Sequence, residues 1–257
     1  MRVGILGAGK MGSWLGRVLS EDHEVAVYDL DPGKAQAVKG VKALKELAEL
    51  APFTPQRLIN AVSLESTVEA YEAAAPFLPK ECLLADVASV KGDIPRYYER
   101  CGFRFTSVHP MFGPTFTDMA SLKGQNAVII TESDPEGGVF FRELFRRLGV
   151  AVFEYTFREH DEMMAHSLTT PFVSTLVFAA CTIHKTVPGT TFARHREIAR
   201  GLLSESDSLL TEVLFNPQSL KQLDKITARL EFLKHVIRDR DHEEAKRFFD
   251  QLRSNVG

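Results

Sequence analysis

Cysteine is scarce in this chain, and the few that occur follow no pairing pattern. Cys82, Cys101 and Cys181 are odd in number, far apart and without C-x-x-C spacing. This pattern argues against a disulfide framework and against a structural zinc site. We therefore expect buried apolar thiols and no bound metal.

Long apolar runs and charge of one dominant sign are also missing. No stretch approaches eighteen consecutive apolar residues, and the first apolar run starts at Arg2, so we expect neither a membrane span nor a signal peptide. The 31 basic and 34 acidic residues are interspersed, giving a net charge of -3. No basic face indicates nucleic acid, so we expect a small-molecule partner and no nucleic-acid partner. Because neither a span nor a signal peptide is expected, we also expect a soluble cytoplasmic protein with no membrane partner.

The alternation of apolar runs indicates the fold. The chain has 257 residues, 44% of them hydrophobic, which suits one large or two modest domains. Up to residue 155, short apolar runs alternate with helical patterns, which predicts an α/β fold with a doubly wound, Rossmann-like and mostly parallel sheet. We expect strands at residues 3–6, 25–28, 57–62, 82–88, 103–108, 126–131 and 150–155, and helices at 41–50, 66–77 and 135–148, the last ended by Gly149.

No strand-like run follows Tyr155, so we place a domain boundary there, between residues 1–155 and an all-α domain at 156–257. Helical patterns run over 159–185, with a kink expected at Pro171, and over 196–215. A third helix carries an apolar stripe formed by Leu220, Leu223, Ile226, Leu230, Leu233 and Ile237. Because this stripe must be covered, we expect a homodimer paired through the C-terminal helices, with packing inside one chain as the alternative.

A glycine-rich run follows the first apolar run: Gly7-Ala8-Gly9-Lys10-Met11-Gly12. In a strand, turn and helix of this kind, Gly7 takes a backbone conformation closed to other residues, Gly9 leaves room for a pyrophosphate, and Gly12 lets the helix pack on the strand. The phosphates would meet free N–H groups at the positive end of the helix dipole. The spacing of a P-loop also occurs here, but Met11 stands where a hydroxyl must hold magnesium.

An acidic residue closes the second predicted strand at the spacing that this fingerprint expects. Asp29 would accept hydrogen bonds from the adenosine ribose, and its charge would repel a ribose phosphate, which favours NAD over NADP. The alternative is that Asp29 only forms a turn with Asp31 and Gly33. With both elements in register, we predict a dinucleotide-binding domain at residues 1–155.

Two predicted strands end in residues that could perform chemistry. Ser89-Val90-Lys91 follows one strand, and His109-Pro110-Met111-Phe112-Gly113-Pro114 follows the next. Ligands of doubly wound folds bind at the carboxyl ends of the strands, and histidine titrates near neutral pH, so His109 is the candidate base for oxidising an alcohol. Ser89 would be its hydrogen-bond partner. Lys91 would contact a substrate carboxylate or the cofactor, or else lie in solvent.

Together, the glycine run, Asp29, Ser89-Val90-Lys91 and the His-Pro-Met-Phe-Gly-Pro run resemble the prephenate dehydrogenases of tyrosine biosynthesis, over essentially the whole chain. The resemblance implies NAD-dependent oxidative decarboxylation of prephenate to 4-hydroxyphenylpyruvate. His109 would accept the proton of the ring 4-hydroxyl while hydride leaves the same carbon, and Ser89 would orient His109. The family also supplies an arginine from its helical domain to a substrate carboxylate.

The arginine and its neighbourhood match the family less cleanly. We favour Arg200, followed by Arg196 and Arg194, at least one of which is a solvated surface cation. Thr170 stands where the family commonly has a histidine and would offer a hydroxyl to the substrate. His166 either enters the pocket or is an ordinary helix histidine. Asp161, after His160, is interpreted as favourable charge at a helix N-terminus.

Alternatives remain open. A β-hydroxyacid dehydrogenase or imine reductase would lack the run that starts at His109, and hydroxyacid enzymes usually place a lysine on the long helix, where Lys185 lies too near the end. An arogenate dehydrogenase differs only by an amine in place of the substrate's side-chain keto group. A non-catalytic NAD-binding sensor is a further alternative, against which the intact pair of Ser89 and His109 argues, and the chain could also be one module of a fusion with chorismate mutase or prephenate dehydratase.

Overall fold

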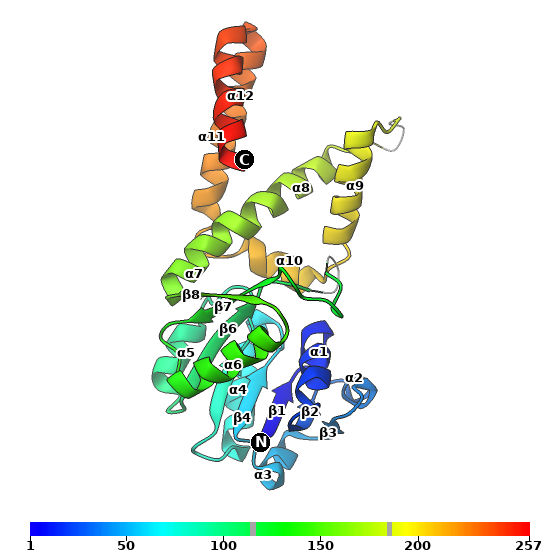
Figure 1. The fold of residues 1–257 in the computed structure, drawn as a ribbon, viewed down its shortest axis with the longest axis vertical. Helices are drawn as coiled ribbons and strands as arrows, with labels where there is room; N and C mark the ends of the chain where they lie inside the picture. Colours follow the sequence, from blue (N-terminus) through cyan, green and yellow to red (C-terminus); the bar gives the residue numbers. More distant parts are fainter. Residues whose placement is uncertain (114–116, 184–186) are drawn as a thin grey trace.

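A single mixed sheet organises the first part of the chain. The computed structural model describes residues 1–113, 117–183 and 187–257, and the strands within them form one eight-stranded sheet of order β3-β2-β1-β4-β5-β6-β7-β8 (Figure 1). Neighbouring strands are parallel except β6 and β7, so the predicted doubly wound, mostly parallel sheet is confirmed. The strands are β1 Arg2–Leu6, β2 Glu24–Tyr28, β3 Lys42–Ala43, β4 Arg57–Asn60, β5 Leu83–Asp86, β6 Phe105–Pro110, β7 Asn126–Ile130 and β8 Ala151–Tyr155.

Helices bury both faces of this sheet, which explains why its strands are apolar on both sides. On one face α1 (Lys10–Leu19), α2 (Pro32–Ala37) and α6 (Pro135–Arg147) share a core with β1 and β2. On the other face α3 (Leu50–Phe53), α4 (Leu64–Ala74) and α5 (Ile94–Arg100) form a second core, which contains three tyrosines. The largest fully buried side chains of the two cores include Phe141, Phe145 and Leu15 on the first face and Tyr71 on the second.

The strand order reverses beside β1. The chain winds outward from β1 to β2 and β3 and then returns to β4 on the other side of β1. The connections that leave β1 and β4 therefore diverge, which opens a crevice at the carboxyl ends of these two strands.

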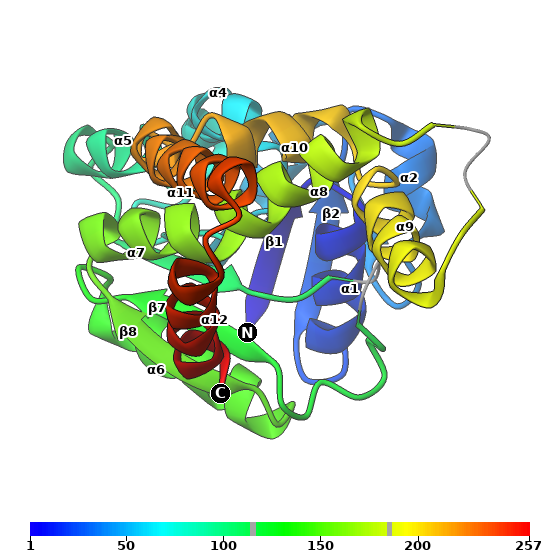
Figure 2. The same ribbon diagram turned by 90° about the horizontal axis from the view of Figure 1, so that it is seen from above.

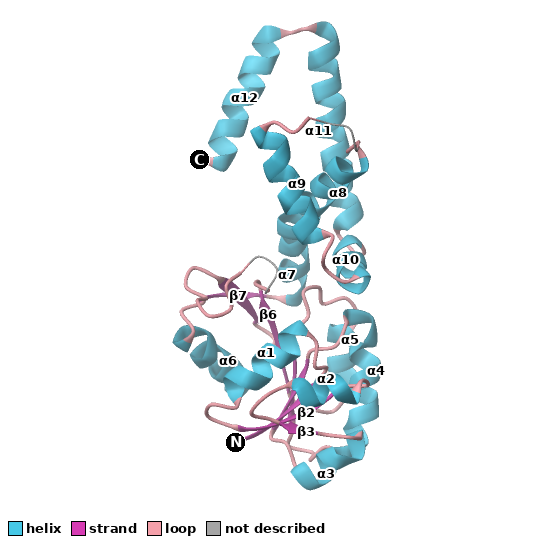
Figure 3. Cartoon of the chain, turned by 90° about the vertical axis from the view of Figure 1, so that its right-hand side faces the viewer, coloured by secondary structure: helices cyan, strands magenta, loops and turns pink. Residues whose placement is uncertain are grey.

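After β8 the described chain is helical. The elements are α7 Phe157–Met164, a π-helical turn Ala165–Thr169, α8 Thr170–Ala180, α9 Thr190–Leu202, α10 Asp207–Leu214, α11 Ser219–Asp239 and α12 His242–Val256. Figure 2, which looks down on this helical region, shows α8, α10 and α11 lying over the sheet. The hairpin of α11 and α12 points away from the sheet (Figure 3).

Two element predictions are wrong. The helix expected at residues 41–50 is replaced by β3, a 3-10 turn at Leu47–Glu49 and the start of α3. The helix expected at 196–215 is two helices, because Ser206 caps α10 by accepting the main-chain N–H of Leu209. The long helix predicted from residue 159 is present, with a π-helical turn at Ala165–Thr169 before α8, and the kink at Pro171 stays a prediction.

The cysteine prediction holds only in part. Cys82 is buried, and burial raises the pKa of its thiol to about 12. Cys101 is partly exposed and Cys181 is exposed, because Cys181 ends α8 on a surface that the chain does not cover. Pro114 and Lys185, which entered the sequence interpretation, lie outside the described residues.

The helical region leaves apolar side chains in solvent. α8 has no buried residue, and on α11 the stripe residues Leu220, Leu230 and Ile237 are 75%, 53% and 74% exposed. Within the described residues, the stretch Phe157–Ala180 is long and apolar enough to cross a membrane by length and composition alone. That is weak evidence for a span, because a packing helix of a soluble protein passes the same test.

Candidate functional site

The glycine loop has the geometry that each glycine was expected to supply. Gly7 has a φ of +90°, and a Cβ added to it would lie 2.9 Å from the carbonyl oxygen of Ala61. A Cβ on Gly12 would overlap the carbonyl oxygen of Gly7, whereas nothing lies within 4 Å of a Cβ on Gly9. The loop is thus closed against the fold at Gly7 and Gly12 and open at Gly9, as a bound pyrophosphate requires.

The first turn of α1 presents uncapped N–H groups to this opening. Its N-cap is Gly9, which has no side chain to accept a hydrogen bond, and the first turn contains no acidic residue. Such a helix end favours an anion. Lys10 reaches across the opening, and its Nζ lies 3.0 Å from a carboxylate oxygen of Glu205 in the connection between α9 and α10.

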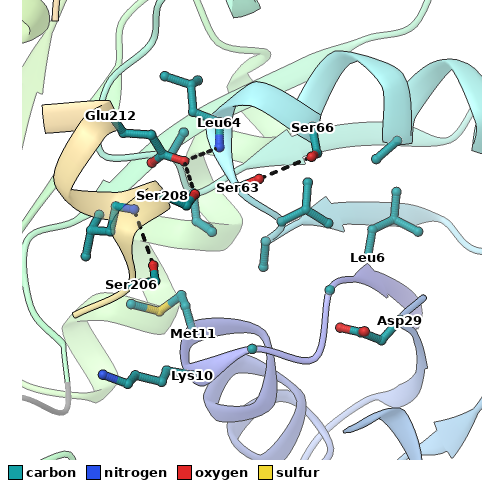
Figure 4. Close-up of a pocket in the computed structure, with 18 of the residues that line it drawn as sticks. Leu6, Lys10, Met11, Asp29, Ser63, Leu64, Ser66, Ser206, Ser208 and Glu212 are labelled. Carbon is teal, nitrogen blue, oxygen red and sulfur yellow. Dashed lines mark hydrogen bonds between the residues drawn. The ribbon is translucent and has the colours of Figure 1, made fainter. Parts of the chain in front are cut away.

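Asp29 follows β2 directly and faces the glycine loop. One carboxylate oxygen accepts the main-chain N–H of Ala8 at 2.6 Å, and the other accepts that of Asp31 at 2.8 Å. Asp29 therefore orders a turn and also lines the cavity (Figure 4), and its contact with a ribose stays a prediction. Asp31, as expected of a turn residue, caps α2 through the N–H of Gly33.

A cavity of about 920 Å³ joins these features to the ends of the other strands and to α10. It is lined, among others, by Gly9, Asp29, Ser89, Pro110, Ser208 and Glu212. Its volume lies within the range of roughly 300–1,000 Å³ that is typical of small-molecule and cofactor sites. The cavity stands at the reversal of strand order, where ligands of doubly wound sheets bind.

His109 lies behind the wall of this cavity, directly before Pro110. It is 4% exposed, and its Nδ1 is 3.0 Å from Nε2 of His160, with the two rings packed edge to face. Ser89 lines the cavity, but the described hydrogen bonds join His109 to His160 and not to Ser89. The predicted Ser89 to His109 bond is therefore corrected, because α7 places a second histidine against Nδ1.

His160 and Asp161 have roles that the sequence did not indicate. Nδ1 of His160 is 2.9 Å from Oδ1 of Asp161, and the same oxygen accepts the main-chain N–H of Lys91 at 3.0 Å. The N-terminus of α7 is capped instead by Thr156 and Glu159, which form a reciprocal capping box. Asp161 is thus a hydrogen-bond acceptor between α7 and the sheet, not principally a charge at a helix end.

Lys91 is neither solvated nor turned toward the cavity. The residue is fully buried, and its Nζ donates to Oδ1 of Asp86 at 2.7 Å and to the carbonyl oxygen of Val108 at 2.8 Å. The other oxygen of Asp86 accepts from the hydroxyl of Tyr98 at 2.9 Å. The ammonium therefore sits in a satisfied buried network, which corrects both predicted roles for this side chain.

Burial keeps both histidine rings uncharged near neutral pH. Desolvation lowers the pKa of His109 well below its usual value, and His160 and the Lys91 ammonium lower it further. Desolvation also lowers the pKa of His160, although Asp161 acts in the opposite direction. A neutral ring is the form of histidine that can accept a proton.

The residues predicted to bind substrate carboxylates lie elsewhere in the single chain. Arg196 and Arg200 line a separate groove of about 310 Å³ between α8 and α9. The hydroxyl of Thr170 accepts a hydrogen bond from Gln222 of α11 at 2.7 Å, and His166 is exposed beside the same glutamine. None of the four lines the larger cavity, so their substrate roles remain predictions.

Glu212 is a site residue that the sequence did not reveal. From α10 it accepts hydrogen bonds from the main-chain N–H of Leu64 and from the hydroxyl of Ser208, and it lines the cavity (Figure 4). It thereby caps α4, whose N-cap Ser63 makes no side-chain cap of its own. Burial raises the pKa of this carboxyl group. No local pattern could have found it, because its partner lies 148 residues earlier.

Curated proteins of similar sequence include an arogenate dehydrogenase and T-proteins. Arogenate dehydrogenase 1, chloroplastic, of Arabidopsis thaliana is 26% identical over 259 residues, which cover 95% of this chain and 40% of that protein. T-protein of Haemophilus influenzae is 30% identical over 110 residues, or 42% of this chain and 28% of that protein. The chain thus spans less than half the length of these curated relatives.

Solved structures share the whole fold. Prephenate dehydrogenase from A. aeolicus, in complex with hydroxyphenyl propionate and NAD+, has a TM-score of 0.84 at 18% identity, covering 99% of this chain and 96% of that one. Synechocystis arogenate dehydrogenase has a TM-score of 0.76 at 22% identity, covering 99% and 98%. The family described as "Prephenate dehydrogenase, nucleotide-binding domain" matches residues 15–145, half of the chain. The predicted nucleotide-binding fold is confirmed, and the chain belongs to the prephenate dehydrogenase family.

Proposed function

We propose that this chain is a cytoplasmic oxidoreductase of tyrosine biosynthesis that converts prephenate to 4-hydroxyphenylpyruvate by oxidative decarboxylation with NAD. The observation that carries the proposal is the position of His109. It is a buried, neutral base one residue from the wall of the cavity that the glycine loop and Asp29 also form. Membership of the prephenate dehydrogenase family supports this chemistry.

The glycine loop and Asp29 fit NAD. The open position at Gly9 and the uncapped first turn of α1 would receive the pyrophosphate, and Asp29 would accept hydrogen bonds from the ribose hydroxyls. The carboxylate disfavours a 2′-phosphate, which supports NAD over NADP. Bound there, the nicotinamide supplies a hydride acceptor. The similar A. aeolicus enzyme has been solved with NAD+.

His109 acts first as the general base and then as the general acid in this reaction. Its free ring nitrogen takes the proton of the ring 4-hydroxyl as hydride leaves the same carbon. The carboxylate on the opposite ring carbon then departs as carbon dioxide, and its bonding electrons restore aromaticity, leaving a phenolate oxygen. His109 returns the proton to that oxygen, so no net proton is released. Ser89, on the cavity wall, is placed to bond the reacting hydroxyl.

Replacing His109 tests this proposal. We expect the native chain to form NADH with prephenate, measured by absorbance, and His109→Asn to lose on the order of 100-fold or more in kcat, as for a missing general base. NAD affinity, measured by calorimetry, should be unchanged in the variant. Equal turnover would remove His109 from the mechanism, and NAD binding by a native chain without turnover would favour the sensor alternative.

Arogenate is the second candidate substrate, and the helical wall of the cavity favours it. That wall presents the carboxylate of Glu212, which would pair better with the ammonium of arogenate than with the keto group of prephenate. Arogenate dehydrogenase 1 of Arabidopsis thaliana, a curated relative, matches 95% of this chain at 26% identity. We expect Glu212→Gln to lower kcat/KM for arogenate more than for prephenate if arogenate is the substrate. Equal changes would assign Glu212 to the cap of α4 alone.

We also propose that the chain works as a homodimer paired through its C-terminal helices. The exposed apolar faces of α8 and α11 support this proposal. Arg196, Arg200 and Thr170 lie outside the cavity of one chain, so any contact they make with substrate depends on how two copies pack.

A further inference from the structure

A line of hydrogen-bonded groups joins His109 to the main chain after β5. His109 Nδ1 lies 3.0 Å from His160 Nε2, His160 Nδ1 lies 2.9 Å from Asp161 Oδ1, and that oxygen accepts the N–H of Lys91. His109 is 4% exposed and His160 is 0% exposed. Because the two rings are shielded from water, each depends on the other for its hydrogen bond.

The positions of the hydrogens follow from the acceptor at the end of this line. A carboxylate has no hydrogen to donate, so His160 Nδ1 must donate to Asp161. A neutral imidazole carries a single N–H, so His160 Nε2 is an acceptor, and the hydrogen between the two rings belongs to His109 Nδ1. The same count leaves a lone pair, and no hydrogen, on Nε2 of His109.

The charges around the rings agree with this count. The Lys91 ammonium and burial disfavour a proton on either ring, and Lys91 is itself paired with Asp86. The carboxylates of Asp161 and Asp86 raise the pKa of His160, but burial lowers it by more. Both rings are therefore neutral at pH 7, which is the condition that the assignment of the hydrogens requires.

Asp161 on α7 is also held in place from two sides. Asp161 contacts the sheet region through the N–H of Lys91, and its carbonyl oxygen accepts a hydrogen bond from the side chain of Asn216 at 3.1 Å. Asn216 is 4% exposed and lies between α10 and α11. Asp161 is thus held by the sheet region on one side and by the connection between α10 and α11 on the other.

We propose that His160 and Asp161 are positioning residues that keep the hydrogen of His109 on Nδ1 and so leave Nε2 free to accept a proton. Their catalytic consequence rests on the proposed function. When His109 takes the substrate's hydroxyl proton, its ring keeps the Nδ1–H bond to His160, whose own N–H faces the Asp161 carboxylate. That carboxylate stabilises the transient positive charge across an intervening ring, as an acidic residue does for a single histidine in a hydrolase triad.

Nitrogen NMR of the histidine rings tests the tautomer without any substrate. The full chain is labelled with 15N-histidine, and the His109 signals are assigned by their loss in His109→Asn. In the native chain we expect a protonated Nδ1 and an unprotonated Nε2. In His160→Leu, which offers no acceptor, the two shifts should move toward a mixture of tautomers, and in His160→Gln the amide oxygen should restore the native shifts. A native His109 protonated on Nε2 would overturn the proposal.

Kinetics tests the consequence with the same variants. We expect His160→Leu to lower kcat on the order of 100-fold with little change in the KM for NAD, and His160→Gln to recover most of that loss. His235→Leu, the same substitution at an exposed site on α11, should leave kcat unchanged. Unchanged kcat in His160→Leu, or equal losses in the Leu and Gln variants, would contradict a positioning role. A native chain that turns over neither prephenate nor arogenate would refute the proposed function, while the NMR result would still decide the tautomer.

Discussion

The sheet region (residues 1–155) and the helical region (residues 156–257) differ in what they bury. The sheet region encloses even charged groups, since Lys91 and Asp86 are both fully buried. The helical region leaves large apolar groups in solvent, such as Leu220 and Ile237 at 75% and 74% exposure. Single apolar side chains such as Leu30 are exposed in the sheet region too, but the helical region carries an apolar stripe on α11 whose burial requires something outside the chain.

Removing the buried charge of Lys91 should cause the largest loss of stability among the changes considered for the two regions. Lys91→Met leaves the Asp86 carboxylate buried with only the Tyr98 hydroxyl as a side-chain donor, so we expect a loss of about 3–5 kcal/mol in the free energy of unfolding. Urea denaturation measures this loss. Lys123→Met, at an exposed position, is the matched control and should change stability little. A small loss in Lys91→Met would mean that the sheet region tolerates an unpaired internal charge.

The two glycines of the loop should separate folding from nucleotide binding. Gly12→Ala forces a Cβ against the Gly7 carbonyl oxygen, so we expect about 1–3 kcal/mol of destabilisation and weak NAD binding. Gly9→Ala meets nothing within 4 Å and should keep the native melting temperature, yet lose NAD affinity because its methyl group occupies the place of the pyrophosphate. Calorimetric titration and thermal melts measure the two effects. Native NAD affinity in Gly9→Ala would move the phosphate site away from this loop.

The free energy of unfolding should fall as the pH is lowered, because two buried histidines lie at the junction of the two regions. The pKa values of His109 and His160 are lowered by folding, so the unfolded chain binds their protons first as the pH drops below 6.5. The stabilising difference is complete above that pH and is lost below it, by at most about 1.4 kcal/mol per pH unit for each histidine. Urea denaturation at pH 7.5 and 5.5 measures the change. His160→Leu should show a shallower dependence, and an identical slope would mean that folding does not lower the pKa of His160.

A charge in the apolar stripe of α11 should have the smallest effect, and it addresses the helical region alone. If a second copy covers the stripe, Leu230→Glu should weaken the dimer about tenfold or more, equivalent to about 1.4 kcal/mol. Light scattering after size exclusion measures the mass. Arg229→Glu, the neighbouring exposed position, is the control. A native chain that is monomeric at every concentration would leave the stripe without its expected partner.

The sequence predicted the sheet region better than the helical region because its signals are local. The glycine run fixes a turn in which Gly7 adopts a φ of +90°, and strand apolarity follows from helices on both faces. The failure at residues 41–50 has a physical reason, since Leu44, Leu47 and Leu50 have helical spacing but β2 offers Ala43 a strand partner. The break before α10 could have been found from Ser206, a good N-cap residue in the middle of the expected helix.

The candidate site was predictable only where a residue stands at the end of its own strand. Asp29 and His109 met that condition: Asp29 lines the cavity, and His109 is buried directly before Pro110, which lines it too. The bond between His109 and His160 joins residues 51 positions apart, and that between Glu212 and Leu64 joins residues 148 apart. Such pairings depend on how α7 and α10 pack on the sheet, which no spacing within one element encodes.

One oxygen atom of Asp161 has a mechanical consequence. It accepts a hydrogen from the main chain after β5 and another from a ring on α7. Because His160 and Asp161 both lie on α7, a tilt of α7 away from the sheet would lengthen the bond from Lys91 to Asp161 and the bond between His160 and His109 at once, and would release the His109 ring to rotate. Proton transfer therefore depends on the angle between α7 and the sheet. A substrate that draws the two regions together would also orient the base that accepts its proton.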